Sequence, residues 1–140
     1  MSAAPASRTF TTPTFIDIDD VKLNSGVVLS VRTITGTGTY TLSSTSGPKE
    51  GNDNIISVNT TDAVTIELPN NVDALVHGRT YTIHSTKASA NITIQGNGKY
   101  INGNPNAVIS VGYASLTFVY NSVVTTLVGQ SPIVGTWFII

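Results

Sequence analysis

The chain has 140 residues, the length of a single domain, and it contains no cysteine. Charged residues make up only 11% of the sequence and the formal net charge is −1, whereas charged residues form about 25% of an average soluble domain. This composition excludes a disulfide framework and a thiolate metal site, and it provides no basic surface for nucleic acid or anionic lipid. A surface so poor in charge favours association with other protein chains.

Residues 1–25 differ from the rest of the chain. Thr and Pro punctuate this stretch, and its candidates for burial are Phe10, Phe15, Ile16 and Ile18. A disordered tail is one interpretation; we favour an extended arm that anchors the chain to a partner or exchanges a strand with a neighbouring copy. The first residues lack the order of a secretion signal, and no run approaches the ~20 apolar residues that cross a bilayer. We therefore expect a soluble protein.

From Gly26 onward, segments rich in Thr, Val and Ile alternate with turn residues, which predicts strands throughout. Between residues 64 and 68, apolar and polar residues alternate with a period of two, which is typical of a half-buried strand. No window shows a helical period, and a single turn near residues 72–76 is the only helix candidate. The expected strands are 27–34, 40–42, 54–59, 64–68, 80–85, 91–95, 107–111, 115–120 and 123–128.

The C-terminal part contains three expected turns and one strongly apolar end. Residues 96–98 and 102–105 are rich in Gly and Asn, and residues 120–123 suit a tight hairpin. The apolar end, which includes Trp137 and Phe138, must pair within its own sheet or bury against a neighbouring subunit, because a bare edge would aggregate. We expect an all-β fold, a compact antiparallel β-sandwich or barrel-like domain over residues 26–140, with residues 1–25 as the arm and a homotrimer as the assembly.

Residue patterns that support catalysis or metal binding are not found in the sequence. His77 and His84 lack the cysteine or carboxylate neighbours of a zinc site, and no serine lies in a G-x-S-x-G motif. The acidic residues 17, 19 and 20 lack the spacing of a calcium loop, and Gly96-Asn97-Gly98-Lys99 lacks the spacing of a phosphate loop and is interpreted as a turn. We expect no enzyme activity, no metal and no cofactor.

Several segments, in a particular order, resemble a β-rich module of tailed-bacteriophage fibres, spikes and head decoration proteins. The resemblance extends from about Thr39 to Val128, and an aromatic segment of that family is replaced here by residues 122–126. The matching segments are Tyr40-Thr41-Leu42, Asn54-Ile55-Ile56-Ser57-Val58-Asn59-Thr60, Ala63-Val64-Thr65-Ile66-Glu67-Leu68-Pro69, His77-Gly78-Arg79-Thr80-Tyr81-Thr82-Ile83, Ala90-Asn91-Ile92-Thr93-Ile94, Gly98-Lys99-Tyr100-Ile101-Asn102-Gly103 and Tyr113-Ala114-Ser115-Leu116-Thr117-Phe118-Val119-Tyr120-Asn121.

The resemblance implies a structural virion protein that forms trimers and acts in stabilisation or adhesion. We expect a capsid decoration, cement or head-fibre protein that is assembled in the bacterial cytoplasm and attached through its N-terminal arm. Its expected partners are further copies of itself and the major capsid protein or another virion protein, with no nucleic acid and no membrane. A tail-fibre or receptor-binding module that uses exposed tyrosines on host glycans is the alternative, and a baseplate or neck component is a third. The expected partner-binding residues are Phe10, Phe15, Ile16, Ile18, Trp137 and Phe138.

Overall fold

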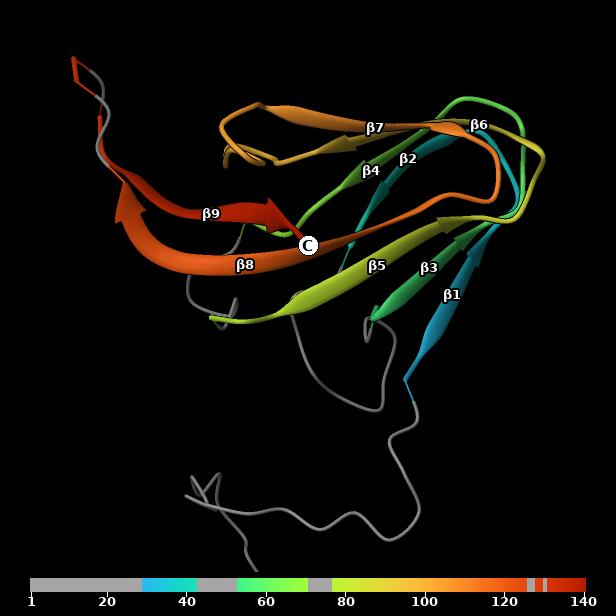
Figure 1. Ribbon diagram of the computed structural model, residues 1–140, viewed down its shortest axis with the longest axis horizontal. Coiled ribbons are helices and arrows are strands. Elements are labelled where there is room, and N and C mark those ends of the chain that lie inside the picture. Colours follow the sequence, from blue (N-terminus) through green and yellow to red (C-terminus); the bar gives the residue numbers. More distant parts are fainter. Residues whose placement is uncertain (1–28, 43–52, 71–76, 126–127, 130) are drawn as a thin grey trace, which may run out of the picture.

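The computed structural model describes residues 29–42, 53–70, 77–125, 128–129 and 131–140. Within these residues the fold is all-β, and its strands form two sheets that face each other (Figure 1). The five-stranded sheet has the order β1-β3-β5-β8-β9, and the four-stranded sheet has the order β2-β4-β6-β7. The strands are β1 (Val31–Ile34), β2 (Gly38–Thr41), β3 (Ile55–Val58), β4 (Val64–Glu67), β5 (Thr80–Ser85), β6 (Ser89–Gln95), β7 (Asn106–Val111), β8 (Ser115–Thr125) and β9 (Ile133–Ile139).

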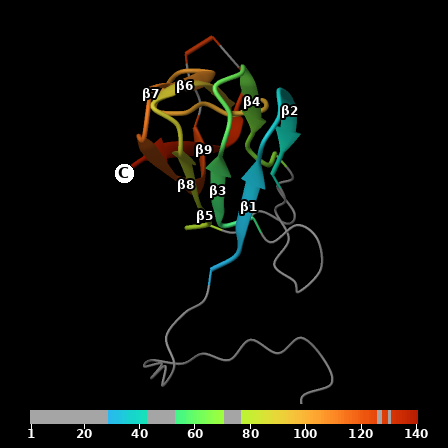
Figure 2. The ribbon, with the colours of Figure 1, turned by 90° about the vertical axis from the view of Figure 1, so that its right-hand side faces the viewer.

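The first six strands wind as three stacked coils. Each coil contributes one strand to each sheet, as β1–β2, β3–β4 and β5–β6, so strands of successive coils pair in parallel. Figure 2 shows β1, β3 and β5 side by side in one layer. Hydrogen bonds also link the corners where a coil changes sheet: Asn59 N donates to Ile34 O at 2.7 Å, and Thr86 N donates to Val58 O at 3.0 Å.

The predicted antiparallel arrangement is therefore wrong for the coils and correct only for the C-terminal strands. β8 pairs antiparallel with β5 and β9, and β7 pairs antiparallel with β6. The error arises because the short polar segments between the two strands of each coil are corners that lead into the opposite sheet. Gly, Thr and Asn suit such corners as well as they suit hairpins. The two-sheet arrangement itself is compatible with the predicted β-sandwich.

Apolar side chains from both sheets meet between them and form one core. The inward positions alternate with outward ones along each strand; in β4, for example, Val64 and Ile66 are buried while Thr65 and Glu67 are half-buried on the outer face. Fully burying an aliphatic side chain stabilises the fold by about 1.5–3 kcal/mol. The buried core residues are Ile34, Leu42, Ile56, Val58, Val64, Ile66, Leu68, Tyr81, Ile83, Ile92, Ile94, Ile101, Ile109, Phe118, Tyr120 and Trp137.

The hairpin predicted at residues 120–123 is not a turn, because β8 continues through it. The pairing register of β8 with β9 shifts between Asn121 and Val124, which places a β-bulge there. Polar groups accommodate the irregular backbone: Asn121 Oδ1 accepts from Val123 N at 3.0 Å, and His77 Nδ1 accepts from Ser122 N at 3.2 Å. The Asn-Ser pair that suggested a hairpin therefore bends a single long strand.

Several other predictions from the sequence are confirmed, and some concern residues that the structure does not describe. The strand over residues 80–85 is confirmed as β5, and the C-terminal segment pairs within its own sheet as β9, against β8. Turns lie at residues 97–98 and 102–103 as predicted. The N-terminal arm, with Phe10, Phe15, Ile16 and Ile18, and the helical turn expected near residues 72–76 lie outside the described residues.

Gly135 provides a test of how tightly the core closes on β9. A methyl group at this position would collide with the Tyr120 phenol, and the backbone has a positive φ of 76°. Gly103 has a similar φ of 82° but open space around it. We expect Gly103→Ala to lower the free energy of unfolding by about 1 kcal/mol from backbone strain alone. Gly135→Ala should lower it by about 2–4 kcal/mol, because overpacking is added to the strain.

Urea denaturation of the two variants beside the wild-type chain measures this difference. Equal losses of stability in the two variants would contradict the close packing of Tyr120 against β9.

Candidate functional site

A pocket lies where the chain passes from β6 to β7. Tight turns shape this connection, since Asn97 and Gly98 have φ values of 52° and 87°. Backbone hydrogen bonds hold this connection together: Gly96 N donates to Pro105 O at 3.0 Å, and Lys99 N donates to Gly96 O at 3.1 Å. A Cβ atom at Gly96 would fall on the Lys99 carbonyl, so this close approach requires glycine.

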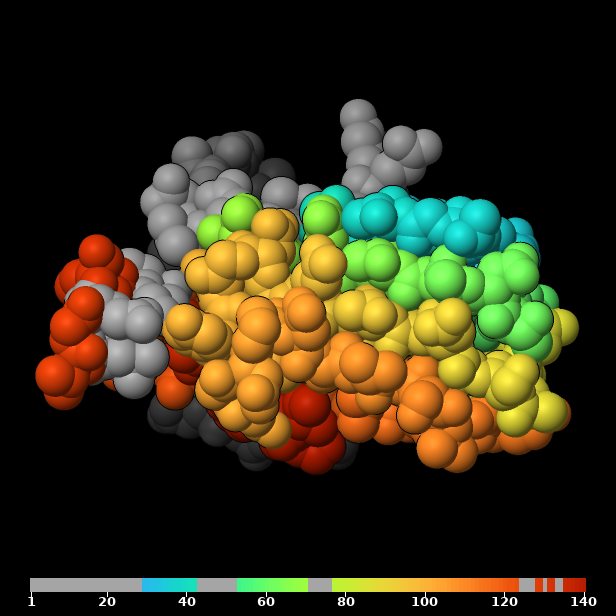
Figure 3. Space-filling model, turned by 90° about the horizontal axis from the view of Figure 1, so that it is seen from above, coloured from blue at the N-terminus to red at the C-terminus, as the bar shows by residue number. Residues whose placement is uncertain are grey.

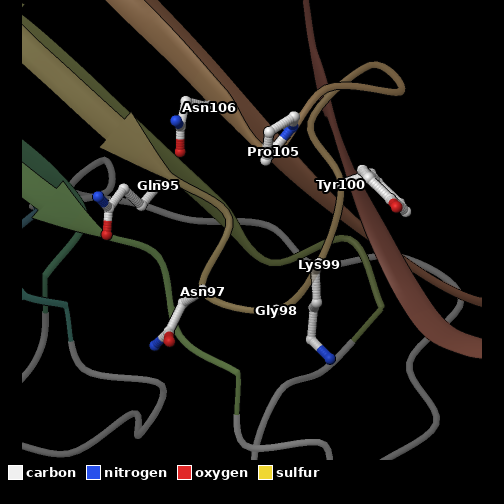
Figure 4. Close-up of a pocket in the computed structure, with 7 residues that line it drawn as sticks. All are labelled: Gln95, Asn97, Gly98, Lys99, Tyr100, Pro105 and Asn106. Carbon is white, nitrogen blue, oxygen red and sulfur yellow. The ribbon is translucent and has the colours of Figure 1, made fainter.

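The pocket has a volume of about 460 Å³, within the range of small-molecule sites. Its lining combines three amide side chains with the apolar surfaces of Tyr100 and Pro105, and Figure 4 shows Gln95 and Asn106 at one side of it, with Asn97 and Lys99 at the other. Amide side chains both donate and accept hydrogen bonds, so this lining suits a ligand rich in hydroxyl or amide groups. The lining residues are Gln95, Asn97, Gly98, Lys99, Tyr100, Pro105 and Asn106.

A row of polar side chains connects this pocket with the outer face of the four-stranded sheet. Strand register aligns Thr41, Glu67, Gln95 and Asn106 across β2, β4, β6 and β7. Figure 3 looks onto this face and shows the four strands as neighbouring bands. Thr41 Oγ1 donates to Glu67 Oε2 at 2.7 Å, so the first two residues are in contact. We call these four residues the polar row.

Behind the pocket, the core contains an aromatic cluster flanked by two cations. The Trp137 ring lies between Tyr81 and Tyr120, with centroid distances of 5.7 and 5.2 Å. Arg79 lies 5.1 Å from the Tyr81 ring centroid, and Lys99 Nζ lies 5.8 Å from that of Tyr120. Burial lowers the pKa of Lys99, because desolvation disfavours its charged form. The cluster is joined to the pocket lining through Lys99 and through the hydrogen bond from Trp137 N to Tyr100 O.

Of the six residues predicted to bind partners, the structure places Trp137 and Phe138. Trp137 is 1% exposed and its indole belongs to the chain's own core, so this side chain is not on a surface that a partner could contact. Phe138 is 38% exposed and its side chain is on the outer side of β9. The remaining four lie outside the described residues.

The outer face of the five-stranded sheet, which includes Phe138, carries no Asp, Glu, Lys or Arg among its described residues. Register aligns Val31, Ile55, Thr82 and Thr117 in one line across this face. A second line contains Thr80, Val119 and Phe138, and a third contains Thr33, Ser57, His84 and Ser115. We call this surface the uncharged face.

Groups that could support catalysis are dispersed in the part of the chain that the structure describes. His77 contacts Ser122, whereas His84 is on the uncharged face. No group of three His, Asp or Glu side chains there is close enough to hold a metal ion. The ion pair between Arg32 and Asp53, with 3.2 Å between Nη1 and Oδ2, links the edge strand β1 to the segment just before β3. No helix among the described residues is long and apolar enough to cross a bilayer.

Sequence reasoning treated the segment 96–99 only as a turn, and it did not identify Gln95, Asn106 or Thr41 as site residues. The signal for this pocket in the sequence is the high density of Asn and Gln around the two turns between residues 95 and 106. The alignment with Thr41 and Glu67 depends on strand register and had no local indication. Of the tyrosines expected to contact host glycans in the alternative function, Tyr100 lines the pocket.

The tyrosines of the aromatic cluster give the protein a specific alkaline sensitivity. Desolvation by burial raises the pKa of Tyr81 and of Tyr120 above the ordinary value of 10.0. Since the unfolded chain ionises these phenols first, their contribution to stability is complete below about pH 10 and is lost as the pH rises through the folded-state values. The free energy of unfolding should therefore decrease above about pH 10, and decrease less in the double variant Tyr81→Phe/Tyr120→Phe.

Urea denaturation at a series of pH values measures both slopes. Lys99 is present in both proteins, so its opposite contribution cancels in the comparison. Identical pH dependence of the two proteins would contradict the burial of the two phenols.

No protein-family model matches the sequence, and no curated protein matches it. Function is therefore inferred from the fold, the pocket and the surface chemistry.

Proposed function

We propose that this chain is a structural, non-enzymatic protein of a tailed-phage particle, a capsid decoration, cement or head-fibre protein. The observation that carries the proposal is the uncharged face of the five-stranded sheet. Its Thr, Val, Ile and Phe side chains can be covered by another chain without burying a charge, and burying an unpaired charge is costly. The resemblance of residues 39–128 to β-rich virion modules supports the same role.

In this proposal, three copies pack their uncharged faces around a common axis to form a homotrimer. Phe138 lies at the edge strand β9, where an aromatic side chain can act as an anchor of such an interface. The N-terminal residues 1–25, through Phe10, Phe15, Ile16 and Ile18, then bind the major capsid protein or another virion protein. The protein is assembled in the host cytoplasm and remains in the virion.

Replacing Phe138 with Asp tests the assembly. A carboxylate buried in a chain–chain interface lacks compensation, so we expect Phe138→Asp to shift a trimer towards monomers by at least tenfold in dissociation constant. Val108→Asp is the matched control, since Val108 is 60% exposed on the outer face of the other sheet. Sedimentation equilibrium measures the masses, and circular dichroism verifies that both variants remain folded. A wild-type monomer, or equal effects of the two variants, would contradict this interface.

The attachment to virions is tested by sedimentation with purified heads of the phage that encodes the chain. The full chain should pellet with the heads, and a chain lacking residues 1–25 should remain in the supernatant while keeping its trimeric mass. A full chain that does not pellet with any part of the virion would overturn the structural role.

A second candidate function, adhesion to host surface glycans as a tail-fibre or receptor-binding module, is favoured by the pocket between β6 and β7. Its amide residues can form hydrogen bonds with sugar hydroxyl groups, and Tyr100 offers a ring for stacking.

Two tyrosines distinguish binding in the pocket from binding elsewhere. Tyr100 lines the pocket, whereas Tyr113 is 66% exposed in the turn between β7 and β8 and does not line it. On a glycan array, Tyr100→Ala should lose about tenfold or more of the signal of a bound glycan, as expected for loss of an aromatic contact. Tyr113→Ala should bind like the wild-type chain. The reverse ranking would place glycan binding outside the pocket.

A further inference from the structure

We propose that the pocket and the polar row form one extended site for an uncharged oligosaccharide that carries acetamido groups. This inference rests on the second candidate function above and specifies its ligand. Three observations support it: the alignment of the row, the chemistry of the pocket, and the position of the charges around both.

The polar row extends the site beyond the pocket. Thr41, Glu67, Gln95 and Asn106 occupy four adjacent strands, and neighbouring strands in a sheet are about 4.8 Å apart. The row therefore spans roughly 14 Å, the length of a short oligosaccharide rather than of one sugar ring. Gln95 and Asn106 belong both to the row and to the pocket lining, so a chain bound in the pocket can continue along the row.

The pocket offers amide groups beside two side chains with flat or apolar surfaces. Gln95, Asn97 and Asn106 each present a carbonyl oxygen and an NH₂ group, which match the N–H and C=O of an acetamido substituent as well as sugar hydroxyls. Pro105 and Tyr100 supply apolar surface for the C–H face of a sugar ring or for the acetamido methyl group. A purely hydroxylated sugar would use fewer of these contacts.

The charges around the site favour a neutral ligand over an anionic one. Lys99 is the only cationic residue in the lining, and it is 7% exposed with its Nζ directed at the Tyr120 ring. Glu67 places a carboxylate in the polar row, where it would repel a phosphate or a uronic acid. Nucleic acid and phosphorylated glycans are bound through several accessible Lys or Arg residues, and neither the row nor the pocket lining provides such a set.

Three soluble probes test the ligand class with the full-length chain: chitotetraose, which is neutral and acetamido-bearing; maltotetraose, which is neutral with hydroxyl groups only; and tetragalacturonate, which is anionic. Isothermal titration calorimetry should detect binding of chitotetraose, weaker binding of maltotetraose by about threefold to tenfold, and no binding of tetragalacturonate. Preferential binding of tetragalacturonate, or no binding of any probe at millimolar concentration, would overturn the inference.

Variants then test the location of the site. Gln95→Ala and Asn106→Ala should each weaken chitotetraose binding by about threefold to tenfold, because each removes an amide that holds the ligand. Asn91→Ala is the matched control, since Asn91 is exposed on the same strand as Gln95 and lies outside both row and pocket. Equal effects of Asn91→Ala and Gln95→Ala would refute the site.

The length of the ligand tests the extension along the row. Thr41→Val should weaken binding of chitotetraose while leaving chitobiose unaffected, because only the longer chain reaches Thr41 from the pocket. An equal effect on both probes would contradict the extended site. Sedimentation equilibrium and pelleting with phage heads, repeated on these variants, separate failure of this inference from failure of the structural role.

Discussion

Packing of branched aliphatic side chains between the two sheets is the interaction that organises the molecule. Ile56 and Ile83 face inward from the five-stranded sheet, and Ile66 and Ile94 face inward from the four-stranded one, all fully buried. Each coil supplies residues to both layers, so each coil that stacks on the previous one also extends the core between the two sheets. The parallel register that aligns these side chains then also aligns the residues that point outward.

This coupling explains why the two outer surfaces are so regular and so different. On the five-stranded sheet the outward residues are Thr, Ser, Val, Ile and Phe with one histidine, His84, and no Asp, Glu, Lys or Arg among the described residues, which makes that face suitable for contact with other chains. On the four-stranded sheet the register brings hydroxyl, carboxyl and amide groups into the polar row, which ends at a pocket. One side of the protein can therefore serve assembly while the other remains available to a ligand, so the structural and adhesive proposals are compatible.

The C-terminal strands complete the core and also support the pocket. Trp137 on β9 fills the space between Tyr81 and Tyr120, and its backbone hydrogen-bonds to the pocket connection, with Trp137 N donating to Tyr100 O at 2.8 Å and Asn102 N donating to Trp137 O at 3.0 Å. The apolar end that predicted an interface thus has two roles. Trp137 holds the fold together, and Phe138, the next residue along the strand, remains on the surface.

The sequence by itself determined the all-β class and the position of most strands, because period-two alternation and β-branched residues act locally. The segment 80–85 is an example, since its strand bounds could be read directly. The sequence did not determine whether paired strands run parallel or antiparallel. The alternation of apolar and polar residues is the same in both arrangements, and the turn residues suit either a hairpin or a corner. The bulge at Asn121 depends on a hydrogen bond to His77, which is distant in the sequence. The polar row depends on the alignment of residues as far apart in the sequence as Thr41 and Asn106. Only the tertiary structure decided these features, since they arise from register between segments that have no sequence relation to one another.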